Sequence, residues 1–584
     1  MARGSLGLSI ATAVMVAAMA IGLPTSLDAQ SGDAGWHQWG GPNRDFIIDA
    51  PGLADRWPDD GPPILWERPL GVGHSAIVEG DGRLFTMYRI GDGRNREGPW
   101  DLEESVVALD AATGATLWEH TYPSALADFN FGAGPHSTPL LVDGRLFTVG
   151  TYKQLYAFEA ATGDILWSHD LVAEFGAPPL LPRPVVRSGY GCSPIAYDDL
   201  VICSVGGPGQ SVMAFRQRDG TVAWRSGHFL TSQAPPILIN VDGQDQLVFF
   251  AGQSVNGLDP TDGRILWSHV HDAGNDLNLS HPLWGDDNIL FVSSAYIAGS
   301  RALRLSRDGE TTNVEELWFS SRLRFMFLNG IRLGDHVYGT SGDFGPAFMT
   351  AIDVRTGDVT WRTRGFARAS LLYADDKLIV MDEDGDLALA RLTPEGLTVL
   401  ARATIFDTTA WTVPTLVGTT LYARDREKIV AIDLGDGTAA PIAGPRTDLS
   451  GTWQLDVDAS LIAGPLLRGG GNGGPADALH ITQAANGTLI VGNLVNAGQA
   501  WSYRPDGETT VPVGVNAGLE VTSRWDGQRF VAEGALPLGT DGPVTQLREV
   551  MALADGGATL TIAVTATTAD GETTNHLVYR RSGS

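Results

Sequence analysis

The sequence predicts an all-β protein: an eight-bladed β-propeller of four-stranded antiparallel blades, followed by a small antiparallel β-barrel-like domain. Three observations lead to this fold class: the composition, a strand-turn-strand phrase that ends in tryptophan, and a second strand-turn-strand phrase before it. The 584 residues include 72 Gly and 32 Pro, and only 18% are charged. This mixture favours many short strands joined by turns over long helices.

The tryptophan phrase recurs along the first three quarters of the chain. It consists of an apolar strand, a turn with Thr-Gly or a variant, and a strand that ends in Trp. The first copy runs from Val106 through Gly114 to Trp118. Similar copies cover residues 155–167, 212–224, 255–267, 303–318 and 351–361, and weaker copies without Trp cover residues 387–400 and 429–433. Self-similarity at this spacing is typical of repeat folds.

The second phrase is an apolar hairpin that precedes each copy of the first. Its eight turns are Asp81-Gly82, Asp143-Gly144, Asp198-Asp199, Asp242-Gly243, Asp286-Asp287, Gly334-Asp335, Asp375-Asp376 and Gly418-Thr419. Most are pairs that tolerate positive φ in two-residue hairpins. Two hairpins per unit make a four-stranded sheet, and eight units predict a closed propeller over residues 62–445. The segment from Pro62 to Trp66 is expected to supply the fourth strand of the last blade and so close the ring.

The repeated tryptophans are predicted to be structural. An indole near the end of each outer strand can cover the neighbouring sheet and bury a large apolar area at the blade junction. The residues expected in this role are Trp66, Trp118, Trp167, Trp224, Trp267, Trp318 and Trp361.

The N-terminus reads as an export signal. Arg3 precedes an uncharged apolar run over residues 6–23, and Ala29 offers a cleavage site, so residues 1–29 are a predicted signal peptide. An uncleaved anchor is the alternative, because the run is just long enough to span a bilayer. We expect a periplasmic or secreted protein without a lipid anchor, since no Cys lies near the cleavage point. Residues 30–61 are predicted to form an N-terminal strap.

The charge balance limits the partners. Lys and Arg number 40 against 68 Asp and Glu, which gives a net charge of −28. A chain this acidic repels nucleic acid and anionic membranes. We therefore expect a protein or a small molecule as partner, and no nucleic acid.

The two cysteines, Cys192 and Cys203, are too few for a disulfide scaffold or a four-cysteine zinc site. They are expected on two strands of one hairpin that turns at Asp198-Asp199, with Pro194 opposite Cys203. That register places the two thiols one diagonal step apart. A disulfide between them and a pair of free buried thiols are both compatible with this arrangement.

The phrase Ala/Val-x-Asp-x-x-Thr-Gly-x-x-x-Trp resembles the repeat of quinoprotein (PQQ-type) β-propellers. That superfamily includes PQQ-dependent alcohol dehydrogenases and the propeller of the bacterial outer-membrane β-barrel assembly machinery. The opening from Trp36 to Arg44 looks like the start of exported PQQ-like repeat proteins, as do residues 341–346, 364–369 and 382–385. The resemblance covers about residues 34–445 and implies the fold more strongly than the activity.

The resemblance leaves the enzyme question open. Quinoprotein alcohol dehydrogenases hold PQQ between a Trp floor and a ring of two adjacent disulfide-bonded cysteines, with Ca²⁺ and an Asp base. Here the two cysteines are eleven residues apart, and no Asp base or calcium pair falls on a matching motif. We therefore predict an exported, non-catalytic binding or protein-interaction scaffold with no cofactor and no metal. The alternative is a PQQ- and Ca²⁺-dependent oxidoreductase acting on an alcohol or a sugar. A third interpretation, an outer-membrane assembly partner, is disfavoured by the missing lipid-anchor cysteine.

Candidate ligand-binding residues lie where the innermost strands should meet the mouth of the central channel. They are polar or ring side chains at the start of those strands: His74, His136, Tyr190, Gln233, His281 and Asn329. Converging imidazoles can bind a metal or an anionic ligand. Hydrogen bonds to neighbouring backbone and channel water are the alternative. The acidic run over residues 382–386 is expected to be a hairpin turn at Asp384-Gly385, and residues 275–278 a solvated loop.

The repeat ends near Pro445, and strands of a different character follow over residues 446–584. Gly451-Thr452-Trp453 opens this segment, and alternating apolar runs joined by turns such as Asn486-Gly487 predict a meander of hairpins. The opening and the up-and-down order resemble a small lipocalin-like barrel. Such a barrel either holds a small apolar ligand or has a filled core.

Overall fold

The computed structural model places most of the chain in short antiparallel strands, as the composition predicts. The structure describes residues 1, 35–58, 61–89, 103–124, 132, 134–180, 188–274, 276–295, 298–326, 328–342, 347–435, 449–462, 475–483, 489–493, 500–503, 508–512, 518–526, 529–537, 544–554, 557–568 and 571–582. The predicted signal peptide and the boundary at residue 445 lie outside these residues. Within them, eight four-stranded sheets and one ten-stranded sheet account for the fold.

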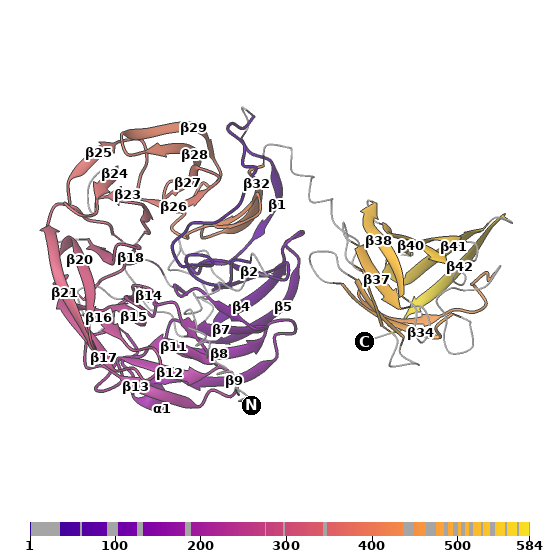
Figure 1. Cartoon of the computed structure of the whole chain (residues 1–584), viewed down its shortest axis with the longest axis horizontal. Coiled ribbons are helices and arrows are strands. Elements are labelled where there is room, and N and C mark those ends of the chain that lie inside the picture. Colours follow the sequence, from indigo (N-terminus) through magenta and orange to yellow (C-terminus); the bar gives the residue numbers. More distant parts are fainter. Residues whose placement is uncertain are drawn as a thin grey trace, which may run out of the picture. The chain divides into compact units, whose positions relative to one another are not determined.

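The eight four-stranded sheets are the predicted propeller blades, which Figure 1 shows arranged around a common centre. Blades one to four comprise β2(Val78–Gly80), β3(Arg83–Tyr88), β4(Glu103–Asp110) and β5(Thr116–Pro123); β6(Leu140–Val142), β7(Arg145–Val149), β8(Gln154–Glu159) and β9(Ile165–Asp170); β10(Ile195–Tyr197), β11(Leu200–Ser204), β12(Val212–Arg216) and β13(Val222–Ser226); and β14(Ile237–Val241), β15(Gln244–Phe250), β16(Ser254–Leu258) and β17(Ile265–Val270). The described residues contain one α-helix, α1(Leu171–Phe175), which follows blade two.

Blades five to eight repeat the same order of strands from the centre outward. They comprise β18(Leu283–Trp284), β19(Ile289–Ser294), β20(Gly299–Asp308) and β21(Thr311–Ser320); β22(Ile331–Leu333), β23(His336–Ser341), β24(Phe348–Asp353) and β25(Val359–Thr363); β26(Ala369–Ala374), β27(Lys377–Asp382), β28(Asp386–Thr393) and β29(Gly396–Thr404); and β30(Thr415–Val417), β31(Thr420–Arg424), β32(Lys428–Asp433) and β1(Ile64–Pro69). The outermost strand of the last blade therefore comes from the N-terminal side of the chain, as predicted, and closes the ring.

The eight predicted turns all join the two inner strands of a blade. Asp81 and Gly82 adopt φ values of 51° and 65°, and Asp143 and Gly144 adopt 47° and 74°. Positive φ at both central residues matches the twist of the flanking strands, which explains the Asp-Gly pairs. The turn at Asp384-Gly385 is also confirmed, since β27 ends at Asp382 and β28 begins at Asp386.

The repeated Trp and Gly form one joint between neighbouring blades. In blade one, Trp118 lies across the strand pair from Ala108, a small residue that leaves room for the indole. The indole N–H of Trp118 donates to the backbone oxygen of Ala160 in blade two, at 2.9 Å. Gly163, with φ of 78°, lies beneath the indole so closely that a β-carbon there would come within 2.6 Å of it. The glycine of the Thr-Gly turn is thus required twice, by its φ and by the Trp of the preceding blade.

The hydrogen bond from the indole to the next blade occurs at five other junctions, and at four of them a turn glycine also lies beneath the indole. The donors and acceptors are Trp66 and Ala111, Trp167 and Gln217, Trp224 and Pro260, Trp318 and Val354, and Trp361 and Thr393. Because Trp66 belongs to the last blade and Ala111 to the first, the same interaction that joins successive blades also closes the ring.

Trp267 departs from this pattern. Its indole N–H donates to Gln246 within its own blade at 2.7 Å, and the Gln246 amide donates in turn to Thr312 of the next blade at 2.8 Å. The next blade has no Thr-Gly turn at this height, because β20 and β21 extend as a hairpin of two ten-residue strands. A glutamine and a threonine therefore make the junction that an indole and a turn carbonyl make elsewhere.

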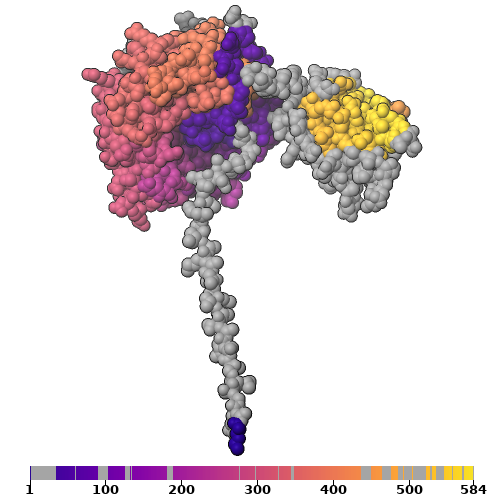
Figure 2. All heavy atoms as spheres, turned by 45° about the horizontal axis from the view of Figure 1, so that its top comes forward, coloured from indigo at the N-terminus to yellow at the C-terminus, as the bar shows by residue number. Residues whose placement is uncertain are grey.

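The described part of the predicted strap, residues 35–58, contacts blades one, two, three and seven. Backbone groups of Trp36 and His37 bond blades one and two, and Arg44 donates to the backbone oxygen of Pro194 in blade three. Farther along, Ile47 forms a parallel bridge with Tyr373 of blade seven. In the space-filling view the indigo N-terminal residues lie against the orange atoms of the last blades (Figure 2). With Trp36 and Phe46 buried to 1% and 0% exposure, the strap is part of the propeller core.

The C-terminal domain is a curled antiparallel sheet (Figure 1). Its strands are β33(Gly451–Leu455), β34(Ala478–Gln483), β35(Leu489–Asn493), β36(Ala500–Tyr503), β37(Glu508–Pro512), β38(Gly518–Asp526), β39(Arg529–Pro537), β40(Val544–Ala554), β41(Thr559–Thr568) and β42(Gly571–Arg581). Neighbouring strands follow the chain, and the first strand, β33, pairs with the last, β42. Trp453 is fully buried, and the Arg581 guanidinium lies 4.4 Å above its ring. The meander is confirmed, while the lipocalin likeness stays a prediction.

Among the described residues, no helix is long and apolar enough to cross a membrane.

Candidate functional site at the channel mouth

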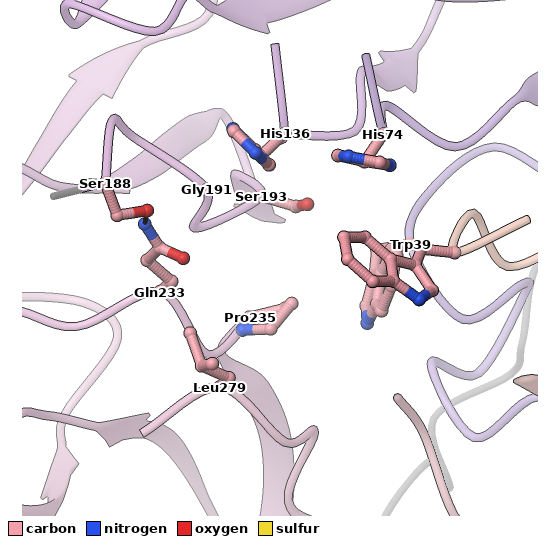
Figure 3. Close-up of a pocket in the computed structure, with 10 residues that line it drawn as sticks. Trp39, His74, His136, Ser188, Gly191, Ser193, Gln233, Pro235 and Leu279 are labelled. Atoms are coloured by element: carbon pink, nitrogen blue, oxygen red, sulfur yellow. Dashed lines mark hydrogen bonds between the residues drawn. The ribbon is translucent and has the colours of Figure 1, made fainter. Parts of the chain in front are cut away.

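A cavity of about 100 Å³ lies at the mouth of the central channel (Figure 3). Its described lining is mixed in character. The lining residues are Trp39, His74, His136, Ser188, Gly191, Ser193, Gln233, Pro235, Leu279 and Trp411. Since one water needs roughly 10–15 Å³ of such space, the cavity has room for several waters or one small organic ligand.

Six of these lining residues occupy one equivalent position in the repeat, four residues before the first strand of their blade. They are His74, His136, Gly191, Gln233, Leu279 and Trp411, which precede β2, β6, β10, β14, β18 and β30. The innermost strands all begin at the same end of the propeller, so this position reaches the cavity in six of the eight blades. Trp39 of the strap and the nearby Ser188, Ser193 and Pro235 complete the described lining.

The aromatic side of the cavity joins blades eight, one and two. The rings of His74 and His136 lie 5.3 Å apart, and those of His74 and Trp411 lie 5.4 Å apart. The guanidinium of Arg426 lies 4.9 Å above the Trp411 ring and 3.4 Å from Nε2 of His74. A guanidinium in contact with an indole face and an imidazole gives this side a positive character.

The opposite side is polar and held by backbone contacts. The Gln233 amide donates to the Ser188 hydroxyl and, at 2.6 Å, to the backbone oxygen of Gly189. Figure 3 shows Gln233 and Ser188 on the side of the cavity opposite Trp39, with His136 and His74 along the wall between them. Trp411 is itself oriented by Glu383, which accepts its indole N–H at 2.9 Å and pairs with Arg368. Such supporting contacts fix the direction of the side chains that face the cavity.

The structure brings together three of the six predicted mouth residues: His74, His136 and Gln233. The other three are buried in the walls, where they connect strands. Asn329 exchanges two hydrogen bonds with the backbone of Leu371 in the next blade, at 2.6 and 3.0 Å. Tyr190 is buried beside Cys192 and Cys203, and burial raises the pKa of its hydroxyl well above the ordinary value.

His281, the third of these buried residues, holds the strap. Its Nδ1 accepts the indole N–H of Trp39 at 3.3 Å, so the proton is on Nε2, which donates to the backbone oxygen of Arg44 at 2.5 Å. Burial first, and the nearby Arg44 charge second, lower the pKa of His281 to about 3. The imidazole is therefore neutral, and both of its nitrogens are engaged, so it is not placed to bind a ligand at the mouth.

Leu279, Trp411 and Trp39 are lining residues that the sequence prediction missed. The position is recognisable from the sequence when the count starts at the hairpin turn: His74, His136, Leu279 and Trp411 each stand seven residues before the first residue of a predicted turn. Choosing polar side chains led instead to His281 and Asn329, which stand five residues before their turns. In these two blades the side chain five residues before the turn bonds the strap or the neighbouring blade.

Two other predicted features, the cysteine pair and the described part of the segment 275–278, are buried in the structure. Cys192 and Cys203 are free and buried, so no disulfide links them in the structure. Burial raises the pKa of the Cys192 thiol to about 12. The expectation of a solvated loop at residues 275–278 is wrong for the described part, because Asp276 and Asn278 are fully buried. The Asn278 amide donates to the backbone of Ala251 and His271, which holds this segment against blade four. Asn275 lies outside the described residues.

The lining does not fit a calcium-bound quinone well. No described lining residue carries a carboxylate, and Gln233 is the single amide among them. Within the described part of the chain, no group of three or more His, Cys, Asp or Glu side chains is arranged to hold a metal ion. Calcium prefers six to eight oxygen ligands, several of them carboxylates. The lining suits a small ring-containing anion better, since two imidazoles line the cavity and the guanidinium of Arg426 lies 3.4 Å from Nε2 of His74.

The described fold is an eight-bladed β-propeller with a small cavity at the end of its channel. The resemblance to the PQQ-type repeat is confirmed: residues 102–363 match the family model PQQ_2, described as outer membrane protein assembly factor BamB. The outer membrane protein assembly factor BamB of Shewanella oneidensis is 23% identical over 300 residues, which cover 48% of this chain and 71% of that protein.

Solved structures of similar fold include BamB from Moraxella catarrhalis and the quinohemoprotein alcohol dehydrogenase from Comamonas testosteroni. The first is 15% identical, with a TM-score of 0.44, and the match covers 64% of this chain and 100% of that one. The second is 12% identical, with a TM-score of 0.46, and the match covers 71% of this chain and 82% of that one.

Proposed function

We propose that this protein is an exported propeller that acts as a non-catalytic binding and protein-interaction scaffold, with a small anionic ligand held at the channel mouth. The observation that carries the proposal is the mouth cavity, which combines two indoles and two imidazoles with no described carboxylate. Those groups can bind and orient a ring-bearing anion. A general base would require a titratable carboxylate or a suitably partnered imidazole within reach of the substrate.

Two further points support a scaffold in the periplasm or outside the cell. The relative in Shewanella oneidensis is named as an assembly factor, which is a protein-interaction role. The predicted signal peptide agrees with export. The net charge of −28 makes nucleic acid an unfavourable partner.

A quinoprotein oxidoreductase acting on an alcohol or sugar is the second candidate, because the repeat is shared with that class and Trp39 lies at the cavity. When bound, PQQ would accept the hydride or the electrons that are removed from the substrate. The absence of a carboxylate from the described lining argues against its calcium-bound form at this site.

Calorimetric titration of the mature protein with PQQ, with and without Ca²⁺, separates the two candidates when a dye-linked alcohol oxidation assay runs beside it. We expect no calcium-dependent binding and no turnover. Calcium-dependent binding with turnover would overturn the scaffold proposal. Benzoate serves as the probe of the mouth: we expect saturable binding that Trp411→Ala abolishes. Benzoate binding that persists unchanged in that variant would place the anion elsewhere.

A further inference from the structure

A second concave site lies between blades five and six, and it shares no lining residue with the mouth cavity. It is a groove of about 520 Å³, larger than the mouth cavity. Its lining comes from the end of β21, the link to β22, the end of β23 and the two outer strands of blade six. The arginines among the lining residues are Arg322, Arg324 and Arg362.

The groove is basic on a strongly acidic protein. No described lining residue is a carboxylate, although the chain carries 28 more acidic than basic side chains. Arg322 and Arg362 are exposed, and neither pairs with a carboxylate among the described residues. Other arginines of the propeller do pair, as Arg216 does with Asp199 and Arg355 with Asp335. The guanidinium groups of Arg322 and Arg362, which lie in one groove without a carboxylate partner among the described residues, form an anion-binding surface.

An aromatic ring holds part of this charge in place. Phe348 lines the groove, and the guanidinium groups of Arg362 and Arg364 lie 5.3 and 5.1 Å from its ring centroid. Contact with the ring offsets part of the repulsion between the two cations and orders their long side chains. Less side-chain entropy is then lost when an anion binds.

The strand at the groove favours a polypeptide as the occupant over a free anion. β25 is the outermost strand of blade six and bonds only β24, so its other edge has unpaired backbone N–H and C=O groups. Val359 and Arg362 of this strand both line the groove, and Val359 is 43% exposed. An extended segment can pair with such an edge while its side chains reach the groove. Its five residues span about 17 Å, enough for acidic side chains at alternate positions to meet several arginines.

We infer that this groove binds an acidic, extended segment of a partner protein by adding it as a strand to β25. Glutamate or aspartate side chains of the segment pair with Arg322 and Arg362, and apolar side chains between them contact Val359 and Phe348. The inference deepens the proposed scaffold function, because it assigns one partner chemistry to one surface. It uses no residue of the channel mouth.

The test measures fluorescence anisotropy of a labelled peptide in which glutamate alternates with valine, added to the full mature protein. We expect saturable binding that weakens as salt rises. The double variant Arg322→Glu/Arg362→Glu is expected to weaken binding at least about tenfold, because two attractive contacts become repulsive. The matched control Arg56→Glu/Arg218→Glu changes the net charge equally at two exposed arginines away from the groove, and it should leave binding unchanged.

Two further arms separate strand addition from simple charge attraction. A peptide with N-methyl groups on alternate residues keeps its charge but cannot complete the strand ladder, and it should bind far more weakly. Hydrogen exchange should slow in β25 on addition of the glutamate peptide and not on addition of inorganic phosphate. Equal binding by the N-methylated peptide, by a lysine-valine peptide or by the groove double variant would overturn the proposal.

The same experiment distinguishes this inference from the scaffold proposal. Trp411→Ala removes a mouth residue and should leave peptide binding unchanged. Loss of peptide binding with intact benzoate binding would refute the groove alone, whereas turnover with PQQ would refute the scaffold and leave a peptide result standing.

Discussion

The outer junctions and the channel mouth are built from the same repeat. They differ in how much the residue at an equivalent position varies from blade to blade. At six junctions an indole donates to a carbonyl of the next blade, and at five of them a turn glycine lies beneath it. At the mouth, the equivalent position holds His, His, Gly, Gln, Leu and Trp in six blades. Uniform positions maintain the ring, because every junction poses the same packing problem. Variable positions are free to build one asymmetric site, which makes them the better guide to function.

The largest effect that tests this comparison is expected at an outer junction. Gly163→Ala places a methyl 2.6 Å from the Trp118 indole at a φ of 78°, so the strain of positive φ adds to displacement of the indole. We expect a loss of roughly 3 kcal/mol in the free energy of unfolding, measured from the urea midpoint. Gly309→Ala has a similar φ of 62° but meets nothing within 4 Å, and it should cost only about 1 kcal/mol.

A double variant isolates the contribution of the contact between Trp118 and Gly163 to the free energy of unfolding. In a Trp118→Ala background, Gly163→Ala should cost no more than Gly309→Ala, because the clashing partner is gone. A Gly163 penalty that stays at its original size in that background would show that φ strain, and not the Trp-Gly joint, requires the glycine.

The uniform positions explain how much of the fold is predictable. Trp118 and Gly163, together with the Asp-Gly turns, recur at fixed spacing, and each has a local physical reason that one sequence reveals. Ring closure was also predictable, because the segment ending at Trp66 has the form of a fourth strand without a hairpin of its own. The site was only half predictable. His74 and His136 are polar at the right offset, whereas Leu279 and Trp411 are found only when the offset itself is counted.

The roles of residues that depend on long-range contacts could not be predicted from the sequence. His281 has a structural role because it bonds Trp39 and Arg44 of the strap, more than two hundred residues away in the sequence. Trp267 carries the same motif as Trp118 but bonds Gln246, because its neighbouring blade has a longer hairpin. A single sequence shows which positions repeat and gives no signal for which neighbour each one meets.

Acid is expected to have an intermediate effect on the free energy of unfolding. The group responsible is His281, which bonds the strap. The folded pKa of His281 is about 3 against an ordinary 6.5, so its neutral form stabilises the fold fully above pH 6.5. As pH falls from 6.5 toward 3, the unfolded state binds a proton that the folded state does not, and stability falls by about 1.4 kcal/mol per pH unit. The urea midpoint should therefore drop between neutral and mildly acidic pH.

The variants His281→Gln and His228→Gln assign that acid sensitivity. Gln at position 281 cannot take up a proton, so the pH slope should decrease by about one proton even if the variant is less stable at neutral pH. His228 is exposed, and its replacement should leave the slope as it is. His271, with a pKa also lowered to about 3 by burial, should account for a similar remaining slope. An unchanged slope in His281→Gln would mean that His281 takes up its proton at the same pH in the folded and the unfolded protein.

The smallest effect on stability, and the sharpest test of the comparison, is expected at the mouth. Gln233→Ala removes hydrogen bonds to Ser188 and Gly189 from a side chain that faces the cavity, and it should cost no more than about 1 kcal/mol in the free energy of unfolding. Benzoate binding should weaken in the same variant, because the polar side of the cavity loses its amide. A Gly163→Ala protein that remains folded should show the reverse, with lower stability and normal benzoate affinity. If Gln233→Ala destabilised the propeller as much as Gly163→Ala, the variable positions would be structural after all, and variation among the blades would no longer mark the binding site.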